Sequence, residues 1–124
     1  MKVLNGIALL FVGLTPVIWL TCFTESYFSL NPLIDTIVPP GFTEAKFASI
    51  KIGMLKNEVL KILPPPTSST STNCYIFRSN KKYNCWYYGN DGVAFVGDFA
   101  WINFEIAFDK EGKVIKTNRY VNAD

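Results

Sequence analysis

Ile102-Asn103-Phe104-Glu105-Ile106-Ala107-Phe108 is the stretch that decides the fold, because its large apolar side chains alternate with smaller or polar ones. A period of two is typical of a β-strand with one face on a hydrophobic core and the other toward water. We expect the face that carries Ile102, Phe104, Ile106 and Phe108 to pack on helices. The opposite face, with Asn103, Glu105 and Ala107, is expected to be wetter.

Further strands are expected on both sides of this stretch. Apolar, aromatic and β-branched residues predict strands over Cys74–Ser79, Tyr83–Tyr88, Phe99–Phe108 and Val114–Val121. Two turn signals, Asn90-Asp91-Gly92 and Asp109-Lys110-Glu111-Gly112, separate the last three. Residues 67–73 are rich in Ser and Thr without any period, so we expect a loop there.

Two short helices are expected before the strands. Thr43 can cap a helix over Glu44–Ile50, and Phe42 before it is a candidate hydrophobic staple. A second helix is expected over Lys56–Leu63 and ends at three consecutive prolines. Its core stripe is expected to consist of Val59, Leu60 and Leu63. Two helices followed by an antiparallel sheet predict an α+β domain of two layers.

The cysteines predict a disulfide. Cys74 and Cys85 flank two strand-like halves, and a fold-back at Ser79-Asn80 places the two cysteines opposite each other. An oxidising compartment would allow the bond, and two reduced thiols in a strand pair are the alternative. No metal site is expected, because the chain has no His and no C-x-x-C motif.

The N-terminal region predicts a membrane anchor. No charged side chain lies between Lys2 and Glu25, and as a helix this run reaches roughly 33 Å, enough for a bilayer core of about 30 Å. A cleaved signal peptide is one alternative, although the run is long and lacks an Ala-x-Ala-like site. A lipoprotein acylated at Cys22 is another, although Trp19-Leu20-Thr21 is a poor lipobox.

Domain organisation follows from the anchor. We expect a transmembrane or signal anchor over residues 1–25, a Pro-containing tether over 26–41 and the α+β domain over 42–124. The tether has too many apolar residues for a free linker, so part of it is expected on the bilayer surface or the domain. Lys2 before the span, with no basic residue after it until Lys46, directs the domain out of the cytoplasm.

Three motifs appear in order along residues 42–124. They are Phe47-x-x-Ile50-x-x-Gly53-Met54-x-x-x-Glu58-Val59-x-x-x-Leu63-x-x-Pro66, Trp86-Tyr87-Tyr88, and Phe108-Asp109-x-x-Gly112-Lys113-Val114. In these motifs the chain resembles the SmpA/OmlA (BamE-like) family, whose members have a helix–helix–three-strand domain in the envelope of Gram-negative bacteria. The resemblance implies family-motif roles for Gly53, Met54, Glu58, Val59 and Pro66.

The chain also departs from the family pattern. Leu55 stands where the family usually has a Ser or Thr helix cap, so half of a capping box is missing. Pro64 replaces the usual glycine after the second helix, and an apolar run replaces the lipobox. These differences weigh against transferring the family's role in outer-membrane protein assembly.

Composition excludes several function classes. Without His, Ser-His, Cys-His and other His-based catalytic schemes are excluded, and no Gly-rich phosphate loop is present, so no cofactor is expected. The chain has 12 basic side chains, of which 11 lie beyond Lys2, and 10 acidic ones. This near balance of charge argues against nucleic-acid binding. Carboxylate pairs, Asp98 with Glu105 or Glu105 with Asp109, leave a hydrolase as the remaining enzymatic alternative.

The sequence thus predicts a non-enzymatic binding module, held by a single span in the bacterial inner membrane with its domain facing the periplasm or cell exterior. Its partner is expected to be an envelope protein or a phospholipid. Tyr87, Glu105 and Asn103 are the candidate partner-binding residues, whereas Trp86 and Phe104 are expected in the core. The alternative is a small inhibitor or exclusion factor, since β-lactamase inhibitory proteins reuse a similar helix–helix–sheet unit.

Overall fold

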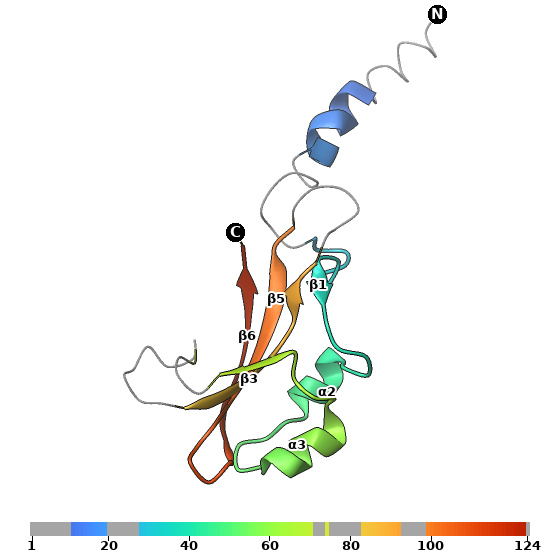
Figure 1. The fold of residues 1–124 in the computed structure, drawn as a ribbon. Coiled ribbons are helices and arrows are strands. Elements are labelled where there is room, and N and C mark those ends of the chain that lie inside the picture. Colours follow the sequence, from blue (N-terminus) through green and yellow to red (C-terminus); the bar gives the residue numbers. More distant parts are fainter. Residues whose placement is uncertain (1–10, 20–27, 71–73, 75–82, 93–98, 124) are drawn as a thin grey trace, which may run out of the picture.

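A computed structural model describes residues 11–19, 28–70, 74, 83–92 and 99–123 of the chain. The fold is α+β, as predicted, with two short helices and two antiparallel sheets (Figure 1). Besides the helical residues 11–19, the described helices are α2 (Glu44–Ala48) and α3 (Lys56–Ile62). The strands are β1 (Thr36–Ile37), β2 (Ser68–Thr70), β3 (Asn84–Tyr88), β4 (Asn90–Asp91), β5 (Trp101–Phe108) and β6 (Val114–Asn122).

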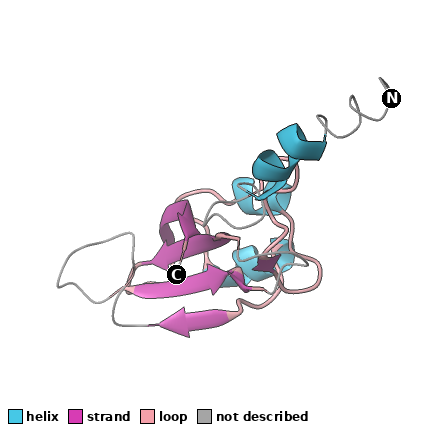
Figure 2. Cartoon of the chain, turned by 90° about the horizontal axis from the view of Figure 1, so that it is seen from above, coloured by secondary structure: helices cyan, strands magenta, loops and turns pink. Residues whose placement is uncertain are grey.

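The larger sheet has the strand order β2-β3-β5-β6, with every neighbouring pair antiparallel. β1 and β4 form a separate two-stranded sheet. Both helices lie on one side of the strands, as Figure 2 shows. The two-layer arrangement expected from the sequence is therefore present.

Local signals place the helix starts. The Thr43 hydroxyl accepts a hydrogen bond from the Lys46 backbone N–H (3.2 Å), and the rings of Phe42 and Phe47 lie 6.1 Å apart as the predicted staple. At α3, Leu55 offers no side-chain cap, while the Glu58 carboxylate accepts from the Leu55 N–H (2.7 Å). Half a capping box was predicted, and half is present.

Aromatic rings hold the helix-facing side of the sheet. The Phe104 ring lies 4.9 Å from that of Phe42 and 5.0 Å from that of Phe47. These ring contacts pack β5 against the helical layer. The predicted stripe of α3 was wrong at one position, because Leu60 is 46% exposed while Ile62 packs on the core beside Val59. Positions three apart share a helix face more closely than adjacent ones.

Two segments pair where the sequence suggested none. Residues 68–70, expected in a loop, form β2 and pair with β3, and Asn90–Asp91, expected in a turn, form β4 and pair with β1. Neither stretch has strand periodicity, so these pairings arise from the neighbouring backbone. Of the strand predicted over Cys74–Ser79, only Cys74 lies within the described residues.

Gly89 makes the passage from β3 to β4 possible. Its φ is +92°, a conformation that favours glycine, and an added Cβ would overlap the carbonyl oxygen of Ile102. The strands approach so closely here that no other side chain fits.

The N-terminal prediction is described only in part. Residues 11–19 are helical and stand apart from the sheet in Figures 1 and 2. Among the described residues, no helix has both the length and the apolar character needed to cross a bilayer. The anchor over residues 1–25 stays a prediction. The expected tether contributes β1 to the fold, and Leu33 and Val38 pack against the core.

Candidate functional site

The candidate partner-binding residues belong to one face of the sheet, opposite the helices. Tyr87 of β3 pairs with Glu105 of β5, and Cys85 pairs with Ala107 one step along the same face. Trp86 and Tyr88 alternate to the helix-facing side, where both are buried in the main core. Tyr87 and Glu105 are therefore brought side by side, and Trp86 lies in the core with Phe104.

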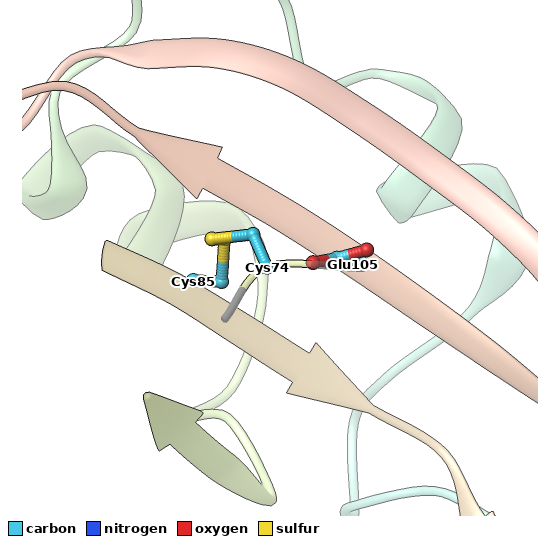
Figure 3. Close-up of side chains that lie close together, drawn as sticks. All are labelled: Cys74, Cys85 and Glu105. Carbon is cyan, nitrogen blue, oxygen red and sulfur yellow. A yellow bond between two sulfur atoms is a disulfide. The ribbon is translucent and has the colours of Figure 1, made fainter. Parts of the chain in front are cut away.

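The expectation that this second face is wet was wrong. Glu105 and Ala107 are fully buried and Asn103 is 8% exposed. The cover is built around the predicted disulfide, which the structure contains: Cys74 is bonded to Cys85 with their Cα atoms 5.7 Å apart (Figure 3). These two cysteines and Ala107 form a second small core against which Tyr83, Tyr87 and Ile115 pack. The sequence pattern of β5 carries no information about a disulfide that packs against this face.

Glu105 and the disulfide form a compact buried group. The sulfur atoms of Cys74 and Cys85 and a carboxylate oxygen of Glu105 all lie within 4.8 Å of one another. Across the described residues these three are the potential metal ligands that gather in this way. A metal binds cysteine as the thiolate, and the two sulfurs are instead bonded to each other. In the oxidised group only the Glu105 carboxylate could therefore act as a metal ligand. The arrangement is that of a structural cross-link.

Asn103 is a structural link between three strand ends. With its amide oriented so that donors meet acceptors, Asn103 donates to the Gly89 carbonyl (2.6 Å) and accepts from the Trp101 Nε1–H (3.0 Å) and from the Asn122 amide. A buried amide with such partners is satisfied within the fold. Asn103 and Glu105 therefore do not offer a surface to a partner, and among the three candidates Tyr87 alone is half-buried rather than buried.

The family-motif residues join the helical layer to the sheet. The Gly53 N–H donates to the Val114 carbonyl (2.7 Å), and the Val114 N–H donates to the Met54 carbonyl (2.8 Å). Gly53 has a φ of +92°, which lets the turn before α3 reach the first residue of β6. Glu58 bonds the start of α3, and Val59 is fully buried. Pro66 is half-buried just after the helix. These roles are structural.

Tyr88 is a residue that sequence reasoning left without a role. Its side chain is fully buried, its ring stacks on Phe42 at 5.1 Å, and its hydroxyl donates to the Pro64 carbonyl (3.0 Å). Burial raises the pKa of Tyr88 from 10.0 to about 12, because the charged phenolate is disfavoured away from water. The sequence did contain a hint of this hydrogen bond. The prolines that begin at Pro64 end the helix, so carbonyl groups there lack helix partners and can accept from another donor.

A hollow lies at the end of the sheet where β5 turns into β6. It has a volume of about 330 Å³ and is lined by Lys56, Tyr83, Asn84, Phe108, Asp109, Lys110 and Gly112. The Lys56 ammonium is engaged over the Phe108 ring at 5.1 Å, and Asp109 accepts from the Lys113 N–H at 2.8 Å. Asp109 thus serves the turn, while Glu105 is enclosed under the disulfide. Asp98, the other candidate acid, lies outside the described residues.

Comparison with models of protein families, with curated proteins and with solved structures found no match. The resemblance to the SmpA/OmlA family stays a prediction from the sequence motifs.

Proposed function

We propose that this protein is a membrane-anchored, non-enzymatic binding module of the bacterial envelope, with its domain outside the cytoplasm. The observation that carries the proposal is the exposed apolar surface of helix 11–19. Phe11 is 69% exposed, Val12 72% and Trp19 62%, and Leu14, Val17 and Ile18 are about half exposed or more. Apolar surface of this extent costs free energy in water, at roughly 25 cal/mol per Å².

The sequence around helix 11–19 supports a lipid environment for it. The helix lies inside the uncharged run between Lys2 and Glu25. A helix that is apolar all round is typical of a membrane segment or a buried core helix. Since this helix stands apart from the sheet (Figure 1), we favour the bilayer as the medium that covers it.

Two further features support an extracytoplasmic domain. The Cys74–Cys85 disulfide is typical of proteins that fold in an oxidising compartment. The position of Lys2 before the apolar run favours a cytoplasmic N-terminus. Both features agree with a domain on the periplasmic or outer side of the inner membrane.

Binding is favoured over hydrolysis by the state of the carboxylates. A two-carboxylate hydrolase needs an acid and a base that both reach the substrate. Glu105, shared by both candidate pairs, is fully buried against the disulfide, and Asp109 is bonded within its turn. Of the three candidate partner-binding residues, Tyr87, Glu105 and Asn103, we propose Tyr87 as the one that contacts a protein or lipid partner.

The test combines topology with membrane extraction. A C-terminal alkaline phosphatase fusion of the full chain is expected to be active and a C-terminal GFP fusion dark, with the protein kept in the membrane fraction at alkaline pH. Leu14→Arg with Val17→Arg should release the protein, because each Arg costs about 2.5–3.5 kcal/mol at the centre of a span.

A matched control places the same charges on the domain. Ile52→Arg with Leu60→Arg alters two exposed apolar residues of the domain and should leave the protein in the membrane. An inactive phosphatase with a fluorescent GFP fusion would contradict the outside assignment. Extraction of the unmodified chain at alkaline pH would contradict the anchor.

A further inference from the structure

The segment between residues 28 and 43 presents an uncharged surface with several exposed apolar side chains. Leu30 is 88% exposed, Ile34 38% and Ile37 58%. Asp35 is the single charged residue of this segment, and its side chain is 1% exposed. We call Leu30, Ile34 and Ile37 the apolar collar.

The apolar collar lies at the end of the sheet where β5 begins and β6 finishes. Beside Ile37, the Thr36 hydroxyl accepts a hydrogen bond from the Ile102 N–H (2.9 Å) at the start of β5. Ile102 pairs in turn with Val121, which is 42% exposed near the end of β6. Figure 1 shows that this end of the sheet faces helix 11–19.

The opposite end of the sheet is charged. The turn between β5 and β6 carries Asp109, Lys110, Glu111 and Lys113, and the Lys56 N–H bonds the Gly112 carbonyl there (3.1 Å). The collar end carries exposed apolar side chains, and Asp91 of β4, which pairs with Thr36, is exposed beside them. Charged residues are denser at the turn end, where four lie within residues 109–113.

Chain length keeps the apolar collar close to helix 11–19. The connection from residue 19 to residue 28 spans at most roughly 30 Å, even when fully extended. The collar contains no Lys or Arg, so attraction to anionic headgroups does not explain it. Its chemistry fits the boundary between headgroups and acyl chains, where amphipathic surfaces bury apolar side chains.

We propose that the apolar collar rests on the lipid bilayer, so that β5 and β6 project away from the membrane and present their charged turn to the envelope space. This inference rests on the proposed anchor. The bilayer holds the collar side of the domain, and partners approach from the charged end and the sheet faces.

Site-specific photocrosslinking of the full chain in phosphatidylcholine nanodiscs tests the proposal. Benzoylphenylalanine is introduced at position 30, 37, 52 or 18, one site per variant. Ile52 is the matched control, because it is apolar and 76% exposed but sits next to Gly53, which bonds the first residue of β6 at the charged end. Position 18 reports on the anchor itself.

We expect lipid adducts at positions 18, 30 and 37, with a yield at position 30 about tenfold above that at position 52. Adducts at 18, with yields at 30 and 37 no higher than at 52, would overturn the collar contact and leave the anchor standing. No adduct at 18 would overturn the anchor and this inference together. Leu30 is 88% exposed and packs little against the domain, so the variant at 30 keeps the test valid even if that at 37 misfolds.

Discussion

The two faces of β5 are buried by different means. On the helix-facing side, rings from separate parts of the chain meet around Phe104. On the other side, a single covalent cross-link, Cys74–Cys85, lies over Glu105 and Ala107, while Asn103 is held by hydrogen bonds. A small domain has little apolar surface to bury. One face of β5 therefore packs on the hydrophobic core, and the other is covered with the help of a disulfide.

This difference also separates structural residues from candidates for function. The helix-facing side is packed with large rings that belong to the hydrophobic core. On the second side, Tyr87 is half-buried, whereas the other two candidate residues, Asn103 and Glu105, are buried. A buried carboxylate beneath a disulfide is therefore a part of the fold, although its pattern in the strand is that of a surface residue.

Removal of the central ring should have the largest effect. Phe104→Ala is expected to lower the free energy of unfolding by about 3–5 kcal/mol, because the fully buried ring contacts both Phe42 and Phe47. Urea denaturation followed by circular dichroism measures the loss. Leu60→Ala, at a side chain that is 46% exposed, is the control and should cost less than about 1 kcal/mol. Equal losses in both variants would show that rings do not close this face.

Loss of the Cys74–Cys85 disulfide should have a smaller effect on stability. Cys74→Ala with Cys85→Ala is expected to lower the free energy of unfolding by about 3 kcal/mol, because the bond restricts the unfolded chain across a sequence separation of 11. Reduction of the unmodified protein should produce a similar loss in the same urea experiment, which separates the bond from the side-chain change. In both cases the β5 amides should exchange hydrogen faster. Unchanged exchange would mean that the disulfide does not cover the second face.

Alkaline pH should weaken the helix-facing side slightly. Below pH 10 Tyr88 is protonated in both the folded and unfolded states, so its contribution is fully present there. Because its pKa is raised from 10.0 to about 12 in the fold, stability is lost as the pH rises through this window. At pH 11 the loss amounts to about 1.4 kcal/mol. Urea denaturation at pH 9 and pH 11 measures it.

The matched variant for this prediction is Tyr88→Phe. It keeps the ring that stacks on Phe42 and removes the titrating hydroxyl. The variant should be less stable at pH 9, because the Pro64 carbonyl loses its donor, and its stability should change less between pH 9 and pH 11. The same pH dependence in both proteins would assign the effect to other groups.

Local features of the fold could be predicted because they depend on near neighbours in the chain. Thr43 and Glu58 mark helix starts through hydrogen bonds that span three residues. Alternation along β5 and β3 assigned Phe104 and Trp86 to one face, where both are buried. The Cys74–Cys85 pairing, predicted from an expected fold-back at residues outside the described part of the chain, is confirmed.

Other features depend on contacts between distant segments, which no short pattern records. Residues 68–70 and Asn90–Asp91 became strands because another backbone lies beside each of them. The expected exposure of Glu105 and Asn103 was wrong for the same reason. Alternation tells which face a side chain takes but does not tell what later covers that face.

The sequence by itself determined the α+β class, the helix caps, the faces of the central strands and the disulfide, because each depends on spacing within about a dozen residues. Only the tertiary structure decided that both faces of β5 are buried, that Gly89 must leave room for Ile102, and that the Tyr88 hydroxyl reaches Pro64. Burial is a property of the space between elements, and that space exists only once the elements have packed.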